Sequence, residues 1–314
     1  MKIVILDRAT LGFDVDMSIF DSLGEVISYD ITLENETISR VNDADIIITN
    51  KVLVTKEIMN EASNLKLICI SATGTNNVDL EYAKQKKISV KNVAGYSSSS
   101  VVQLAFSMIF HFIQKLSYYK KYVDEQNWQK SQIFTHIDKP FFELDGKKVG
   151  IIGLGDIGSN LARKVKAFDC EVVYYSTSGK NSNNEYKRVE LDELLSICDI
   201  ISIHCPLNEN TKNLLNYENM KNIKDGSILL NLGRGGIINE ADLAKIIDEK
   251  EIYCGIDVVF VEPILESNPL LRVKNKQRLL LTPHIGWASI EARTKLVSMV
   301  AKNIEEFISQ EKSL

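Results

Sequence analysis

Cysteine, proline and long apolar runs are all scarce in this sequence. It has five prolines and five cysteines, and no two cysteines form a C-x-x-C pair. An odd number of scattered cysteines indicates reduced thiols rather than a disulfide framework, and we assign no metal ligand or nucleophile among them. The longest apolar stretch, residues 101–113, is interrupted by polar side chains and is too short to cross a bilayer. The sequence therefore predicts neither a disulfide-rich scaffold nor a membrane protein.

Basic clusters and a targeting segment are also missing. The 37 Lys and Arg residues face 42 Asp and Glu residues, the net charge is -5, and no basic block stands out, so nucleic-acid binding is not expected. At the start, MKIVILDRAT, the charges of Asp7 and Arg8 interrupt the apolar run too early for a signal peptide. We expect a cytoplasmic protein. Its 314 residues, 45% of them hydrophobic, predict two domains with packed cores.

Short apolar segments alternate with helical patterns along the whole chain. Such alternation predicts parallel sheets, and segments rich in Ile, Val and Leu are typical of strands covered by helices on both faces. The fold class is therefore α/β, with two doubly wound parallel-sheet domains. The segments are KIVIL, ADIIIT, LKLICI and ISVKNV in the first part, and KVGIIG, CEVVYY, DIISIH, SILLNL, CGIDVV and RLLLTP in the second.

A glycine-rich turn follows the first strand of the second part. Residues 149–158 read VGIIGLGDIG, so Gly153, Gly155 and Gly158 have G-x-G-x-x-G spacing between an apolar strand and an amphipathic helix. Gly153 permits the tight turn, Gly155 lets the backbone approach a pyrophosphate, and Gly158 lets helix and strand pack closely. The helix N-terminus adds N–H donors and the positive end of a dipole. This segment predicts a Rossmann dinucleotide-binding domain.

The position of the turn in mid-chain divides the sequence. We predict that residues 1–99 begin a separate, flavodoxin-like domain and that residues 100–288 form the Rossmann domain. The final helix, from Ser289 to about Ile308, has no strand after it, so residues 289–314 are expected to return to the first domain and make it discontinuous. A single helix from Ser97 to about Lys121 is expected to link the two domains. A loop over residues 122–146 should follow it.

Three charged residues stand where strands of the second domain are expected to end. They are Arg234 in NLGRGG, Glu262 in DVVFVEP and His284 in TPHIG. Ligands of open α/β sheets bind beyond the carboxyl ends of the strands, where these side chains should gather. Taken singly, each has an ordinary explanation as a surface charge, a turn residue or a strand-end histidine. Together they predict an acid-base site.

Several longer strings extend this pattern over nearly the whole chain. Through them the sequence resembles the D-isomer-specific 2-hydroxyacid dehydrogenase family. Two further strings, GYSSSSVVQLAFSM and HIGWAS, resemble most the glycerate dehydrogenase or hydroxypyruvate reductase branch. The strings that carry the family resemblance are SATGTNNVDL, NVAGYS, GKKVGIIGLGDIG, CPLNENTKNLLN, ILLNLGRGGIINE, GIDVVFVEP and LLTPHIGWAS.

The resemblance implies roles for the charged residues. Arg234 matches the arginine that binds the substrate carboxylate and carbonyl oxygen, which suits a planar guanidinium. His284 matches the proton carrier, and Glu262 matches the carboxylate that orients the imidazole and stabilises its charged form. Asp257 matches an aspartate near the nicotinamide carboxamide, with a purely structural role as the alternative.

The resemblance also implies a substrate loop and further cofactor contacts. Backbone N–H groups of the first domain should bind the substrate carboxylate, and Trp287 either walls the pocket or simply packs. N–H groups at the start of the helix should bind the pyrophosphate, and two strand ends should line the riboses. The substrate loop is Thr73, Gly74 and Thr75; the pyrophosphate group is Gly155, Asp156 and Ile157; the strand-end residues are Cys205, Pro206, Leu232 and Gly233.

The adenosine ribose site departs from the usual pattern. About 20 residues after the glycines, an acidic residue normally accepts hydrogen bonds from the ribose and favours NAD. Here Ser176 stands at that position, followed by Thr177, Ser178 and Lys180. Hydroxyls and a lysine tolerate a 2′-phosphate, so NADP stays open, as does the alternative of a solvated loop. We hypothesise NAD with relaxed discrimination, on family precedent.

The implied activity is hydride transfer between a nicotinamide cofactor and a small D-2-hydroxy or 2-oxo acid. Reduction of hydroxypyruvate or glyoxylate is the leading expectation, with a sensor or co-repressor that binds cofactor without turnover as the alternative. Formate oxidation would require glutamine in place of Glu262. No metal site is indicated, because no His or carboxylate cluster has ligand spacing. A homodimer is expected from the family, with the long helix from Ser97 and the loop after it as the contact.

Overall fold

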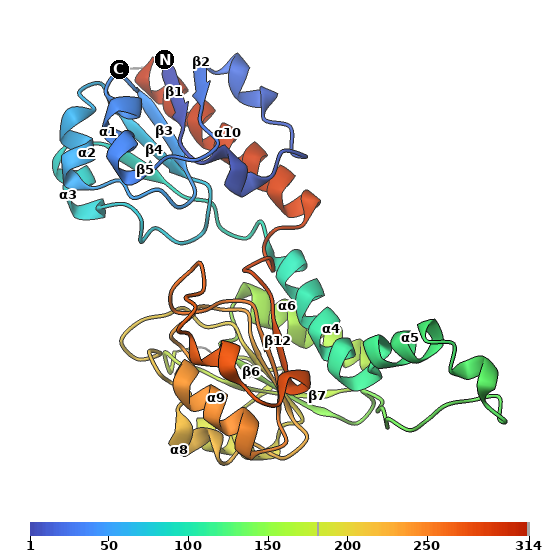
Figure 1. The fold of residues 1–314 in the computed structure, drawn as a ribbon. Coiled ribbons are helices and arrows are strands. Elements are labelled where there is room, and N and C mark those ends of the chain that lie inside the picture. The colour runs from blue at the N-terminus through green and yellow to red at the C-terminus, as the bar shows by residue number, and fades with distance from the viewer. Residues whose placement is uncertain (181, 313–314) are drawn as a thin grey trace. The chain divides into compact units, whose positions relative to one another are not determined.

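Two compact units make up the chain in the computed structural model, which describes residues 1–180 and 182–312 (Figure 1). One unit combines Met1–Ser97 with the segment that begins at Trp287, and the other is the continuous segment Ser98–Gly286. Each unit has its own parallel sheet with apolar cores on both faces. The predicted class, α/β with two doubly wound parallel sheets, is confirmed.

The sheet of the first unit has five parallel strands in the order β2-β1-β3-β4-β5. This is the flavodoxin-like order, as predicted. The apolar segments of the sequence do not predict β2, because this edge strand is short and only half-buried. The strands are β1 (Lys2–Ile5), β2 (Glu25–Ser28), β3 (Ile46–Thr49), β4 (Leu67–Ile70) and β5 (Ser89–Lys91).

Helices cover both faces of this first sheet. Successive strand residues point to opposite faces, so Val4 packs with one set of helices and Ile3 with the other. The last helix, α10 (Ile290–Glu311), buries Leu296 and Ile304 in the same core as Ile3. The C-terminal helix thus completes a core that β1 begins, and the unit is discontinuous. The opposite face is covered by α1 (Glu34–Val41), α2 (Lys56–Glu61) and α3 (Leu80–Gln85).

The sheet of the second unit has seven parallel strands in the order β12-β11-β10-β9-β6-β7-β8. Counted from its first strand, this is the Rossmann order 3-2-1-4-5-6 with one strand added at the end. The short edge strand β8 has no apolar signature and is not predicted from the sequence. The strands are β6 (Lys148–Ile152), β7 (Glu171–Tyr175), β8 (Lys187–Arg188), β9 (Ile200–Ile203), β10 (Ile228–Asn231), β11 (Tyr253–Ile256) and β12 (Leu279–Leu281).

Two layers of helices also enclose the second sheet. On one face, Met108 and Leu161 are fully buried with residues of β6, and on the other face Leu194 and Ile247 are fully buried with residues of β9. The first layer is α4 (Ser98–Gln114) with α6 (Asp156–Val165). The second layer is α7 (Leu191–Ile197), α8 (Tyr217–Met220) and α9 (Glu240–Glu249).

The single helix predicted from Ser97 to about Lys121 is wrong. The chain forms α4 and then α5 (Leu116–Asp124), separated by Lys115 in the left-handed conformation with φ of 50°. The reason is loss of packing, since α4 follows the sheet as far as Phe112, whereas α5 has no buried residue. None of the helices in the described part of the chain combines the length and apolar character that a membrane span needs.

Candidate active site

The glycine turn joins β6 to α6 at the carboxyl edge of the second sheet. Gly153 has φ of +93°, and a Cβ there would lie 2.7 Å from the Cys205 nitrogen, so only glycine fits this position. A Cβ on Gly158 would lie 2.3 Å from the Gly153 carbonyl oxygen, because the helix packs tightly on the turn. By contrast, Gly155 faces open space and is exposed. The turn is closed on its inner side and open where a phosphate would approach.

The start of α6 is arranged to present backbone donors. Gly155 caps the helix, and Asp156 and Ile157 are its first two residues, so their N–H groups belong to the unpaired first turn. The carboxylate of Asp156 accepts a hydrogen bond from the hydroxyl of Ser98. The side chain is thereby occupied within the unit, and the backbone of the turn stays open to an anion.

Other predicted cofactor residues follow the ends of neighbouring strands at the same edge. Ser176, directly after β7, is buried, and its hydroxyl has no hydrogen-bond partner among the residues that the structure describes. Cys205 and Leu232 are also buried, while the Gly233 N–H donates to the side chain of Asn231 at 3.1 Å. An orphaned hydroxyl at the ribose position and an open glycine turn fit a dinucleotide.

The cysteine in this group contributes no reactive thiol. Burial raises the pKa of the Cys205 thiol to about 11, and burial likewise raises the pKa of the other four thiols. A protonated thiol is a poor nucleophile and metal ligand. Cys205 is therefore available through its backbone, and the carbonyl of Pro206 already accepts the hydroxyl of Thr211 at 2.7 Å.

The structure brings His284 and Glu262 into direct contact. Nδ1 of His284 lies 2.6 Å from Oε2 of Glu262, and the side chains are 26% and 31% exposed. The other carboxylate oxygen of Glu262 accepts the N–H of Val259 at 3.1 Å. Since Nδ1 is engaged by the carboxylate, Nε2 is the ring nitrogen that can exchange a proton with a ligand.

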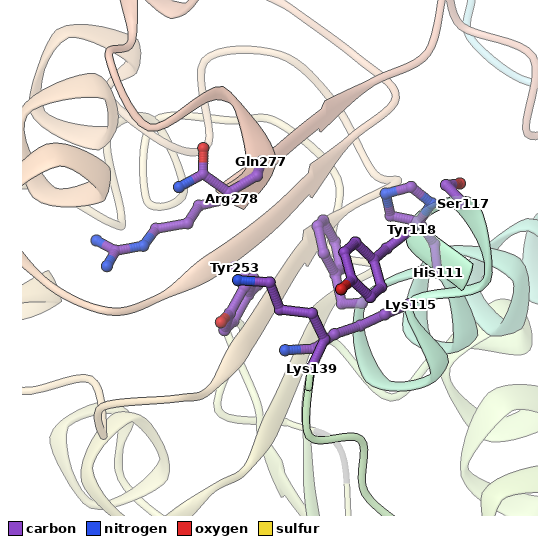
Figure 2. A pocket seen from close by; sticks show the side chains of 9 residues that line it. His111, Lys115, Ser117, Tyr118, Lys139, Tyr253, Gln277 and Arg278 are labelled. Carbon is purple, nitrogen blue, oxygen red and sulfur yellow. The ribbon is translucent and has the colours of Figure 1, made fainter. Parts of the chain in front are cut away.

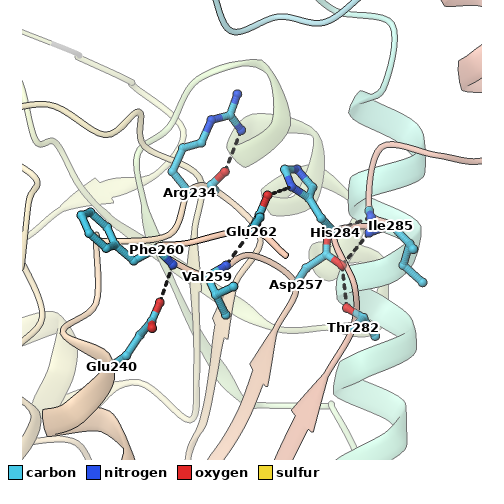
Figure 3. Close-up of polar contacts among 11 residues, drawn as sticks. Arg234, Glu240, Asp257, Val259, Phe260, Glu262, Thr282, His284 and Ile285 are labelled. Atoms are coloured by element: carbon cyan, nitrogen blue, oxygen red, sulfur yellow. Dashed lines mark hydrogen bonds and ion pairs between the residues drawn. The ribbon is translucent and has the colours of Figure 1, made fainter. Parts of the chain in front are cut away.

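Asp257 supports the turn on which His284 stands. This buried carboxylate accepts the hydroxyl of Thr282 at 2.6 Å and the N–H groups of Ile285 at 2.9 Å and Gly286 at 2.8 Å (Figure 3). His284 itself has φ of 53°, a conformation that needs such support. These contacts give Asp257 the structural role that the sequence leaves as an alternative.

Arg234 lies on a turn held by a residue that sequence reasoning missed. Asn231, buried at the end of β10, donates through Nδ2 to the Arg234 carbonyl at 2.9 Å and accepts the N–H of Gly233. The Arg234 side chain is exposed, and its Nη1 donates to the Gly233 carbonyl at 2.8 Å. Figure 3 shows Arg234, Glu262 and His284 beyond the ends of the strands. The available signal in the sequence is a strand-end asparagine two residues before a glycine, Asn231 before Gly233.

The predicted substrate residues of the first unit lie in a loop after β4. The hydroxyl of Thr73 donates to the Val93 carbonyl at 3.0 Å, and Asn92 donates to the Thr73 carbonyl at 2.7 Å. These bonds fix the loop that continues through Gly74 and Thr75. Asp79 caps α3 by accepting the N–H of Tyr82 at 2.9 Å.

Trp287 packs within the first unit. Its ring meets the ring of Tyr96 edge to face, with centroids 6.3 Å apart, and it borders the core that α10 completes. The packing role that the sequence offers as one alternative is therefore present in the structure.

A cavity of about 490 Å³ lies elsewhere in the second unit (Figure 2). Lys115, Tyr253 and Arg278 line it, and the last two stand at the amino-terminal ends of β11 and β12. Ligands of open α/β sheets bind at the opposite, carboxyl edge. None of the predicted site residues lines this cavity. Within the described ranges of the chain, no group of three or more His, Cys, Asp or Glu residues is placed to hold a metal ion.

His204 is a further residue of this sheet edge. It directly follows β9, its Nε2 contacts the hydroxyl of Ser202 at 2.8 Å, and its buried Nδ1 meets no hydrogen-bond partner in the described chain. Burial lowers the pKa of His204 to about 4. This histidine is neutral at physiological pH.

A Rossmann unit that carries an open glycine turn and a histidine–carboxylate pair at one sheet edge defines the class of nicotinamide-dinucleotide-dependent dehydrogenases. Comparison with known proteins narrows this class. The family model described as "D-isomer specific 2-hydroxyacid dehydrogenase, NAD binding domain" matches residues 106–286 of this chain. The chain belongs to the D-isomer-specific 2-hydroxyacid dehydrogenase family.

Relatives match the chain over nearly its full length. A hydroxypyruvate reductase of Blautia hydrogenotrophica is 40% identical over 98% of this chain and 97% of the relative. A glycerate dehydrogenase of Methylorubrum extorquens is 32% identical over 98% of this chain and 96% of the relative. A solved NAD-dependent formate dehydrogenase of Staphylococcus aureus, in complex with NAD, gives a TM-score of 0.79 at 26% identity, covering 99% and 96% of the two chains. The predicted family and branch are confirmed.

Proposed function

We propose that the protein transfers a hydride between a nicotinamide cofactor and a small D-2-hydroxy or 2-oxo acid, and that it works as a reductase of hydroxypyruvate or glyoxylate. The observation that carries the proposal is the 2.6 Å contact between His284 and Glu262 at the edge where the glycine turn opens. The names of relatives, hydroxypyruvate reductase, glycerate dehydrogenase and glyoxylate reductase, support this substrate class.

The residues divide the chemistry among them. Glu262 accepts a hydrogen bond from Nδ1 and stabilises the imidazolium of His284, which donates its Nε2 proton to the carbonyl oxygen of the 2-oxo acid during reduction. In the oxidising direction, neutral His284 accepts the hydroxyl proton. The cofactor supplies or receives the hydride at the substrate carbon. Arg234 binds the substrate carboxylate and the carbonyl oxygen through its guanidinium.

Further contacts complete this proposal. N–H groups of Thr73, Gly74 and Thr75 bind the substrate carboxylate, and Trp287 limits substrate size. The open turn from Gly153 to Gly158 holds the pyrophosphate on the N–H groups of Gly155, Asp156 and Ile157. Leu232 and Gly233 contact the nicotinamide ribose, while Cys205, Pro206 and Ser176 contact the adenosine ribose. NAD is the cofactor by the family's domain description, and Ser176 leaves room for NADP.

Steady-state oxidation of NADH and of NADPH with a panel of 2-oxo acids tests the proposal. We expect turnover with hydroxypyruvate or glyoxylate. A protein that binds NADH but turns over none of the acids would be a cofactor sensor, and the proposal would fail. Glutamate rather than glutamine at position 262 predicts that formate is not oxidised.

We also propose a homodimer formed through residues 116–142. This segment exposes many large apolar side chains, and Phe134 is 89% exposed. Such a concentration of apolar surface marks an interaction site. Light scattering should give twice the mass of the 35.4 kDa chain, and a monomer would contradict the proposal. The exposed apolar side chains of this segment are Leu116, Val123, Trp128, Ile133, Phe134, Ile137, Phe141 and Phe142.

The five free cysteines support a reducing, cytoplasmic location.

A further inference from the structure

Glu240 holds the loop that carries Glu262. Glu240 is the first residue of α9, and its Oε1 accepts a hydrogen bond from the N–H of Phe260 at 2.6 Å (Figure 3). Its Oε2 accepts a hydrogen bond from Nδ2 of Asn268 at 2.7 Å. Phe260 and Asn268 stand on either side of Glu262 in the loop after β11. A single carboxylate therefore fixes this loop before and after the residue that contacts His284.

The fixed backbone leads directly to the histidine. Val259, the neighbour of Phe260, donates its N–H to Oε1 of Glu262 at 3.1 Å, and Oε2 of Glu262 meets Nδ1 of His284 at 2.6 Å. Movement of the Val259–Phe260 peptide would move the donor that orients Glu262. The position of the imidazole partner thus depends on the bond from Phe260 to Glu240.

Asn268, the second partner of Glu240, and the turn that carries Arg234 are also held by contacts. Asn268 is buried, and its Oδ1 accepts the N–H of Leu270 at 2.9 Å to cap a 3₁₀ helix, Pro269–Arg272. A Cβ on Gly235 would lie 2.0 Å from the Val259 carbonyl oxygen, so the turn of Arg234 touches the Glu262 loop through backbone atoms. Displacement of this loop would therefore reach Arg234 as well.

We infer that Glu240 is a positioning residue for proton transfer at His284. The inference rests on the proposed function, because it assigns Glu240 a purpose in that reaction. A carboxylate at the first position of a helix also favours the helix dipole, and this alternative requires only the charge. Positioning requires the reach of the side chain and its acceptor for Phe260. The two explanations predict opposite effects for two conservative substitutions.

Glu240→Asp keeps the charge and loses the reach. Glu240→Gln loses the charge and the acceptor for Asn268, but it keeps the reach and the acceptor for Phe260, the bond next to the donor that orients Glu262. We expect Glu240→Asp to lower kcat by about 10- to 100-fold, as displacement of a catalytic group does, with the KM for the cofactor unchanged. Glu240→Gln should retain most of kcat. Glu249→Gln, at the other end of α9, is the matched control and should behave as wild type. A loss in Glu240→Gln alone, an equal loss in both variants, or no loss in either would overturn the inference.

A second measurement does not depend on turnover. The Nδ1 proton of His284, hydrogen-bonded to a carboxylate, should give a low-field proton resonance that is assigned by its loss in His284→Asn; the chain has only four histidines. We expect Glu240→Asp to broaden or remove this resonance and Glu240→Gln to keep it. An unchanged resonance in Glu240→Asp would contradict the inference. If wild type reduces no 2-oxo acid, the proposed function fails, while the resonance still tests the positioning. Asp is favourable at a helix start, so Glu240→Asp should fold.

Discussion

Nδ1 of His284 and Oε2 of Glu262 lie 2.6 Å apart although the two residues are 22 positions apart in the chain. The contact forms because each residue stands on a turn that another carboxylate holds. Asp257 fixes the turn of His284, and Glu240 fixes the loop of Glu262. Paired in this way, the imidazole has one nitrogen engaged and one available, which is the arrangement that general acid-base catalysis requires.

Removal of either member of this pair should slow catalysis without preventing cofactor binding. We expect His284→Asn to lower kcat for 2-oxo acid reduction by about 100- to 10,000-fold, because the proton donor is lost. Glu262→Gln keeps the size of the side chain and loses its charge, so it should lower kcat less. NADH binding, measured by fluorescence, should be unchanged in both. Wild-type kcat in His284→Asn would show that another group supplies the proton.

Arg234→Lys tests whether a planar fork is needed rather than a positive charge. Lysine cannot bind a carboxylate and a carbonyl oxygen with paired N–H groups. We expect a decrease of about 10- to 100-fold in kcat/KM for the 2-oxo acid, the loss of one charge-assisted hydrogen bond. The Kd for NADH should stay constant. Equal kcat/KM values for the two proteins would remove Arg234 from the substrate site.

Ser176→Asp should restrict the choice of cofactor. The hydroxyl of Ser176 is buried, and the proposed function assigns it the position where a carboxylate would accept hydrogen bonds from the ribose and repel a 2′-phosphate. We expect the ratio of kcat/KM for NADPH to that for NADH to fall by about 10-fold or more. Ser178→Asp, two residues farther along the loop, is a control for added charge. An unchanged ratio in Ser176→Asp would place the ribose elsewhere.

The buried ring nitrogen of His204 makes the free energy of unfolding depend on pH. Because the pKa of His204 is about 4 in the folded protein and 6.5 in the unfolded chain, the unfolded chain binds the proton more readily. The contribution of neutral His204 to the free energy of unfolding is complete above pH 6.5 and is lost as the pH falls towards 4. Urea unfolding should show a loss of about 2 kcal/mol from this residue between pH 7 and pH 5. His204→Asn cannot titrate and should lose correspondingly less, whereas an equal loss in both proteins would show that His204 does not titrate in this range.

The parts of the fold that depend on a local residue pattern can be predicted from the sequence. The strand–turn–helix order around Gly153 and the apolar strands predict both sheets, because each of these signals lies within about ten neighbouring residues. The edge strands β2 and β8 are not predictable in this way, since a strand that is half-exposed has no continuous apolar run. The break at Lys115 depends on where the sheet ends beneath the helix, and this is a property of the fold.

The candidate site also combines residues that can be predicted from the sequence with residues whose role depends on the fold. Arg234, Glu262 and His284 are visible in the sequence because they are charged residues in strings that resemble a known family. Their supports, Asn231 and Glu240, are ordinary polar residues in sequence. Glu240 acquires its role only when the fold brings it to Phe260, 20 positions away. Contacts of this kind decide the geometry of the site and leave no local signature.

Helix α10 has a consequence for the order of events during translation. Because it covers one face of the first sheet, the strands of that sheet cannot bury this face until α10 leaves the ribosome. Residues 98–286 emerge earlier and contain both of their cores. The dinucleotide-binding unit can therefore fold first, while the strands synthesised before it wait for a helix synthesised after it.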